Sequence, residues 1–229
     1  LGKPMLTALI LIPLCAGCIM LLWGRAVICR VGLPLTALVH TALAALTAVR
    51  VGKGENPAEL NGLLAPDALG VLFLMLASLL FLAASFYAMH YLREEERIGV
   101  HTNILDHGRF TNAPERRFTA CLCFFLSAMT LVTITPHMGA QWVGIEATTL
   151  SSAQLIYFHR HKSSLEATWK YLIICSVGIA LALLGNILLS VAFHGAEGAT
   201  GAAHGMDQVG SFVHPAALAA PTWLKAAFV

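Results

Sequence analysis

Charged residues are scarce in this sequence. Asp, Glu, Lys and Arg make up 11% of its 229 residues, whereas a soluble globular domain carries about 25%. The chain also lacks a glycine-rich phosphate loop, a nucleophile elbow, interleaved basic and aromatic residues, and any repeat of about 20–50 residues. These absences argue against a soluble catalytic domain and against a nucleic-acid partner.

The sequence consists mainly of long apolar blocks. Apolar residues make up 58% of the chain, and the mean hydropathy is +0.75. Six blocks have about the 20 residues that an α-helix needs to cross roughly 30 Å of hydrocarbon. The sequence therefore predicts an all-α, polytopic transmembrane helical bundle embedded in a lipid bilayer. The six predicted spans are 4–24, 31–49, 68–89, 118–135, 138–158 and 171–193.

A further apolar run begins at Pro221 and continues to Val229. Proline suits the first turn of a helix, so we expect the start of a seventh span, and we expect the sequence to be the N-terminal part of a longer protein. We divide it into an N-terminal three-span segment (1–92), a cytoplasmic loop (93–117), and a segment with spans four to six and the truncated seventh (118–229).

Basic residues are concentrated in alternate loops. One side holds only Lys3, Arg50 and Lys53, and the loop 194–217 on that side has no basic residue. The positive-inside rule then places the N-terminus outside and the arginine-rich loops in the cytoplasm. We expect the cytoplasmic (inner) membrane. The basic residues assigned to the cytoplasm are Arg25, Arg30, Arg93, Arg97, Arg109, Arg116, Arg117, Arg160 and Lys162.

Two cysteine pairs have spacings that also occur in metal sites. Cys15 and Cys18, and likewise Cys121 and Cys123, lie in apolar blocks without clustered histidine or acidic neighbours. We interpret them as small apolar residues that pack between helices. We therefore predict no metal site and no cofactor on this chain.

Glu146 is the most informative residue. It carries the only formal charge between His137 and His159, in the middle of a predicted span. A carboxylate at that depth costs several kcal/mol unless it is paired, hydrated or protonated. We therefore predict an ion or proton site at Glu146, with a structural bond to a neighbouring helix as the alternative.

Small residues recur beside this glutamate. Gly144, Thr148 and Ser152 are spaced four apart, which favours close approach of another helix. Each helical residue advances about 100°, so Glu146 lies about 160° from Gly144 and from Thr148. We expect Glu146 to point away from the close-packed face, toward another neighbour or a hydrated gap.

Two lysines are candidate partners of Glu146 in proton transfer. Lys170 follows a predicted capping box from Ser163 to Glu166 that would start a helix near residue 164. Its alternative role is to extend toward the cytoplasmic interface. Lys225 would enter the seventh span from the outside. An ammonium near the carboxylate keeps it ionised, and withdrawal of that charge allows it to be protonated.

Two further polar residues lie within predicted spans. His40 is in span two and Asn186 in span six. For both, a hydrogen bond between helices is the first interpretation, and membership of a proton relay is the second.

The strings WVGIEATTLSS (142–152) and SLEATWKYLIICSVG (164–178) resemble hydrogenase-4 component F, a membrane protein. That component belongs to an antiporter-like family shared with formate hydrogenlyase, the proton-pumping subunits of respiratory complex I and Mrp-type sodium/proton antiporters. The resemblance is strongest over about 118–193 and over 222–228. Some complex I relatives place the glutamate directly after the tryptophan, where this chain has Val143, which favours the hydrogenase-4 branch.

The resemblance implies that Glu146 and Lys170 belong to a proton half-channel built from inverted five-helix repeats, with the first repeat beginning near residue 118. A further central lysine of that repeat is expected beyond Val229. The implied function is a non-catalytic, proton-translocating subunit of a hydrogenase-4-like or complex I-like oxidoreductase. Its implied partners are other membrane subunits and a cytoplasmic arm that holds iron–sulfur clusters and a nickel–iron centre. A Mrp-type antiporter subunit and a passive membrane anchor are the alternatives.

Overall fold

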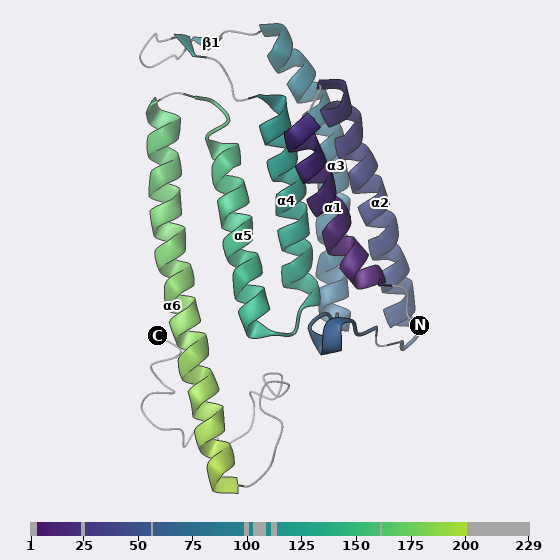
Figure 1. The fold of residues 1–229 in the computed structure, drawn as a ribbon, viewed down its shortest axis with the longest axis vertical. Helices are drawn as coiled ribbons and strands as arrows, with labels where there is room; N and C mark the ends of the chain where they lie inside the picture. Colours follow the sequence, from purple (N-terminus) through teal and green to yellow (C-terminus); the bar gives the residue numbers. More distant parts are fainter. Residues whose placement is uncertain are drawn as a thin grey trace. The chain divides into compact units, whose positions relative to one another are not determined.

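The computed structural model describes residues 4–23, 26–55, 57–98, 101–102, 109–110, 114–160 and 162–200 (Figure 1). The all-α prediction is confirmed. Two-residue strands β1 (His101–Thr102) and β2 (Arg109–Phe110) pair only with each other, antiparallel, and η1 (Leu60–Gly62) is a short 3₁₀ helix. The long helices are α1 (Met5–Trp23), α2 (Ala26–Gly52), α3 (Ala68–Ile98), α4 (Glu115–Ile134), α5 (Met138–Ile156) and α6 (Lys162–Thr200).

The chain forms two compact units, Leu1–Ile173 and Ile174–Val229. The first unit contains α1 to α5 and the beginning of α6. The described part of the second unit is the remainder of α6, up to Thr200.

Within the described residues, five helices are long and apolar enough to cross a membrane, by length and composition: α1, α2, α3, α4 and the part of α6 up to Leu188. The chain is therefore a multi-pass membrane protein. The predicted fifth span is present as α5, but α5 is not among these five helices. Its glutamate, hydroxyl and amide side chains lower its apolar character.

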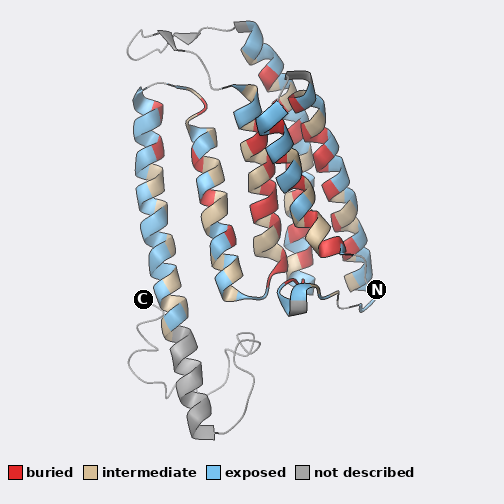
Figure 2. Cartoon of the chain, in the orientation of Figure 1, coloured by how far each residue is buried: buried red, intermediate tan, exposed pale blue. Residues whose placement is uncertain are grey.

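Helix α4 packs against α1, α2, α3 and α5 (Figure 1). Small residues allow these close approaches. A Cβ on Gly17 of α1 would lie 2.7 Å from the Phe124 ring of α4. Seven residues earlier on α1, the Ile10 carbonyl accepts a hydrogen bond from Ser127 Oγ of α4 at 2.9 Å. The buried residues follow this central helix along its length (Figure 2).

Two apolar clusters form the core of the first unit. One includes Met20, Cys29, Leu33, Phe81, Cys123 and Leu126. The other includes Leu6, Leu9, Ala44, Leu64, Leu74 and Ile134. Cys123 thus packs as a small apolar residue, as predicted, and Cys29 does the same, whereas Cys15 and Cys18, predicted to pack between helices, are exposed on α1.

Arg30 joins three helices at the end of the bundle predicted to be cytoplasmic. The sequence placed it in a loop, but it lies in α2, because α1 and α2 are separated by only two residues. Its guanidinium pairs with Glu96 near the end of α3 and contacts both carboxylate oxygens of Glu115 at the start of α4, at 2.6 and 3.2 Å. Helix α3 also continues to Ile98, so the charged segment 93–97 is helical.

At the opposite end of the bundle, Glu59 links the connection between α2 and α3 to the start of α1. It lies in the connection between α2 and α3, and its carboxylate accepts hydrogen bonds from the backbone N–H groups of Leu6 (2.9 Å) and Thr7 (2.8 Å) and from the Thr7 hydroxyl (2.7 Å). These N–H groups in the first turn of α1 have no partner within the helix. Burial alone would raise the pKa of Glu59, but these hydrogen bonds and one from Met5 N–H outweigh it and lower the pKa below its ordinary value of 4.5.

Close contact between α4 and α5 centres on Gly144. A Cβ at this position would lie 2.6 Å from Val132 Cγ2 and 3.4 Å from the Ala128 carbonyl oxygen. The predicted close-packing face is therefore confirmed at Gly144. Ser152, two turns further along the predicted face, hydrogen-bonds to Tyr171 of α6.

We predict that Glu59→Gln destabilises the first unit by about 0.5–2 kcal/mol, the usual cost of losing a helix N-cap. Because folding lowers the pKa of Glu59, its stabilising contribution is present above pH 4.5 and is lost as the pH falls below that value. Thermal unfolding of the detergent-solubilised protein from pH 3 to 8 would measure both effects. Glu55→Gln, an exposed glutamate of the same connection, is the control. Equal midpoints for the two variants would contradict the capping role.

We predict that Gly144→Ala destabilises the contact between α4 and α5 by about 1–3 kcal/mol, because the added methyl overpacks against a stiff, β-branched valine. Gly178→Ala is the matched control, since a Cβ there meets nothing within 4 Å. Denaturation midpoints of both variants test this. The close-contact interpretation fails if Gly144→Ala is as stable as the control.

Candidate functional site

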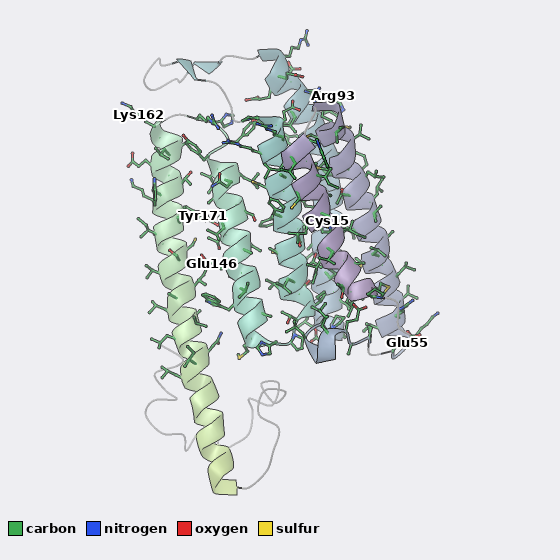
Figure 3. The ribbon with its side chains drawn as sticks, in the orientation of Figure 1. Cys15, Glu55, Arg93, Glu146, Lys162 and Tyr171 are labelled. Carbon is green, nitrogen blue, oxygen red and sulfur yellow. The ribbon has the colours of Figure 1, made fainter. Side chains whose placement is uncertain are left out.

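Glu146 lies in the middle of α5 and is half-buried. Gly144, two residues earlier, faces α4, and Figure 3 shows the Glu146 side chain on the side of α5 away from α4. The predicted orientation of Glu146 relative to Gly144 is therefore confirmed. Within the described part of the first unit, no side chain forms a hydrogen bond or ion pair with Glu146.

Hydroxyl side chains follow Glu146 along α5, and they are satisfied by the helix itself. Thr148 and Thr149 both donate to the Ile145 carbonyl, at 2.7 and 3.1 Å. Ser151 donates to the carbonyl of Ala147 at 2.8 Å. Such bonds allow polar side chains to lie at membrane depth and often bend the helix slightly. The turn that carries Glu146 is thus polar but needs no water to satisfy its hydroxyls.

Tyr171 joins the end of α5 to the beginning of α6. Its hydroxyl lies 2.7 Å from Ser152 Oγ, which also donates to the Thr149 carbonyl at 2.9 Å. Since the Ser152 hydrogen is directed to that carbonyl, the Tyr171 hydroxyl donates to Ser152. Tyr171 was not among the site residues predicted from the sequence, although it directly follows Lys170 in the motif that carries the resemblance.

Lys170 has a different partner from the one proposed. Its side chain is 70% exposed and its Nζ lies 2.5 Å from Glu166 Oε1, one turn earlier on α6. Glutamate four residues before lysine is the favourable order on a helix. This pair also replaces the predicted capping box from Ser163 to Glu166, because Ser163 already lies inside α6, which begins at Lys162, and the Glu166 carboxylate is directed to Lys170. The other proposed partner, Lys225, lies outside the described residues.

His40 is buried and hydrogen-bonded at both ring nitrogens. Nε2 lies 2.9 Å from Thr130 Oγ1 of α4, and Nδ1 lies 3.1 Å from Ser78 Oγ of α3. Thr130 Oγ1 is closer to the carbonyl of Leu126, at 2.7 Å, and gives its one hydrogen to it. Ser78 Oγ likewise donates to the carbonyl of Leu74 at 2.7 Å. The first interpretation of His40, a hydrogen bond between helices, matches this geometry.

Asn186 is half-buried on the part of α6 in the second unit. No hydrogen bond of its side chain occurs within the described part of that unit. Its proposed role thus stays a prediction.

We predict that His40→Leu destabilises the first unit by about 1–3 kcal/mol, because it removes a buried link between α2, α3 and α4. His40→Gln retains a donor and an acceptor and should recover part of the loss. Unfolding midpoints measure this, with the exposed His90→Leu on α3 as control. Unchanged stability of His40→Leu would refute the linking role.

A curated relative shares part of the sequence, whereas no protein-family model matches it. Over 126 residues the chain is 32% identical to a protein named hydrogenase-4 component F homolog from Methylacidiphilum infernorum (isolate V4), a match that covers 55% of this chain and 24% of that protein. The chain thus spans about a quarter of the length of this curated relative.

A solved structure shares the fold. It is a chain of the membrane-bound sulfane sulfur reductase (MBS), an archaeal respiratory membrane complex, with a TM-score of 0.65 at 18% identity, over 83% of this chain and 38% of that chain. At this identity the likeness shows the fold alone. Together the two comparisons confirm the resemblance that the motifs of α5 and α6 indicated: the chain is similar to hydrogenase-4 component F and has the helical fold of a respiratory-complex membrane subunit.

Proposed function

We propose that the chain is part of a proton-translocating membrane subunit of a hydrogenase-like respiratory complex. The observation that carries the proposal is Glu146, a half-buried carboxylate in the middle of α5 without a partner in the described part of its unit. A membrane carboxylate held by a permanent ion pair cannot readily exchange a proton, whereas one whose partner changes can do so. The similarity to hydrogenase-4 component F supports the choice of complex.

Glu146 is the proposed proton carrier. Lys170 and Lys225 are the proposed modulating cations. The present Glu166 pair leaves the Lys170 ammonium on the exposed surface of α6, so modulation by Lys170 would require it to leave Glu166. An exposed i,i+4 pair is screened by solvent and contributes little, so that exchange would be energetically small.

His40 and Asn186 are secondary candidates for the relay. The hydroxyl partners of His40 lie close to the backbone carbonyls of Leu74 and Leu126, at 2.7 Å each. A proton path through these hydroxyls would end at carbonyls that cannot pass a proton on. The contacts of His40 therefore favour a structural role over a relay.

The proposal places redox chemistry in other subunits. Iron–sulfur clusters and a nickel–iron centre would lie in a cytoplasmic arm, and this chain would hold no cofactor. Its neighbours would be further membrane subunits in the inner membrane, with the N-terminus outside. The uneven distribution of basic residues supports this orientation.

We predict that Glu146→Gln, in the full-length subunit within its assembled complex, lowers redox-driven proton movement at least tenfold. The amide retains the size of the carboxyl but cannot carry a proton. Quenching of a pH-sensitive dye in inverted membrane vesicles measures the movement. Glu55→Gln is the control, because it makes the same chemical change at an exposed position of the connection between α2 and α3.

Redox activity and native gels show whether the Glu146→Gln complex still assembles. Unchanged proton movement in an assembled complex would reject the site and favour a passive anchor. Replacement of sodium by an impermeant cation separates the remaining alternative, since only a Mrp-type sodium/proton exchanger would then lose transport.

A further inference from the structure

A groove lies where the ends of α3, α4 and α5 meet in the first unit. Its volume is about 350 Å³. The Phe118 and Phe158 rings pack with centroids 4.9 Å apart, and Tyr87 stacks on Tyr91 at 6.4 Å. Its wall is therefore mainly aromatic and apolar. The lining includes Ala84, Tyr87, Tyr91, Phe118, Phe158 and His159.

One end of the groove is polar. The Tyr91 hydroxyl lies 3.3 Å from His159 Nε2, and His159 Nδ1 lies 3.8 Å from Glu95 Oε1. Both Tyr91 and His159 lie near helix ends, next to the exposed charged residues Arg93 and Arg160. Tyrosines at such positions are typical of a membrane–water interface.

The other end of the groove reaches into the predicted hydrocarbon region. Ala84 lies nine residues before Arg93 on α3, which is about 14 Å along the helix. Ala84 and Tyr87 are exposed on the described surface, Tyr87 by 73%. The groove thus runs from a polar interface into apolar depth and is open along its side.

Basic residues outnumber acidic ones at this end of the described bundle, and Glu94 is paired with Arg97. Glu95 and Glu96 face His159 and Arg30, respectively. Among the described residues, several other cations at this end of the bundle have no ion-pair partner. They are Arg93, Arg116, Arg117, Arg160 and Lys162. An anionic group beside the groove would therefore meet unneutralised cations.

We propose that this groove binds an anionic phospholipid of the cytoplasmic leaflet, with one acyl chain along Ala84, Tyr87 and Phe118 and the headgroup beside His159 and Arg160. Basic residues beside apolar surface at a membrane interface suit such headgroups. The volume lies at the lower end of small-ligand sites, about 300–1,000 Å³. A stable protein partner would need a surface of about 800 Å² on each side, which a groove of this size does not supply.

The acyl-chain part is tested with Ala84→Phe, which fills the groove from an exposed position. Ala83→Phe is the matched control, because Ala83 is also exposed on α3 but does not line the groove. Native mass spectrometry of the complex containing the full-length subunit, with added phosphatidylglycerol, would count retained lipids. We expect Ala84→Phe to lose at least one bound lipid and the control to lose none. Equal retention by both variants would overturn the proposal.

The headgroup part is tested with Arg160→Gln. We expect the preference for phosphatidylglycerol over phosphatidylcholine to fall at least threefold, whereas Arg50→Gln, at the opposite end of the bundle, leaves it unchanged. No preference in the unmodified complex would refute an anionic headgroup. A photo-crosslinking amino acid at position 84 should label lipid, and a protein adduct there would instead show that a partner subunit covers the groove. None of these measurements depends on proton movement, so they stand apart from the test of Glu146.

Discussion

Inside a bilayer, polar groups have no water to bond to and must be satisfied by protein, and the described helices follow this constraint closely. Hydroxyls of α5 bond back to carbonyls of their own helix, and His40 is held at both nitrogens between α3 and α4. The N–H groups that open α1 are met by Glu59, more than fifty residues away. Glu146 differs from these polar groups, because it is half-buried and has no partner in the described part of its unit.

The position of Glu146 depends on the packing of α4 and α5. Gly144 allows α5 to approach Val132 so closely that any side chain would clash. This contact sets the rotation of α5 about its axis, and the rotation directs Glu146 away from the central helix. A helix so fixed on one face can present an ionisable group on the other without losing its place in the bundle.

Contacts within a single helix could be predicted from the sequence, whereas contacts between helices could not. The orientation of Glu146 relative to Gly144 followed from the 100° advance per residue, because both residues are on one helix. The pairing of Lys170 did not follow from membrane depth, because its partner Glu166 lies one turn away on the same helix. Arg30 was assigned to a loop because its charge interrupts an apolar run, yet two glutamates from α3 and α4 neutralise it within α2.

The sequence by itself determined the class of protein, the six long helices of the described residues and the candidate glutamate, because these depend on apolar block length and on the cost of burying charge. The predicted seventh span, from Pro221 to Val229, lies outside those residues. Helix neighbours were decided only by the tertiary structure. The contacts of His40 with Ser78 and Thr130, of Glu59 with α1, and of Ser152 with Tyr171 join residues whose separation along the chain carries no sign of their proximity. Inside the membrane an apolar helix face packs against lipid about as well as against another helix. Small residues and polar contacts therefore determine which helices pack together.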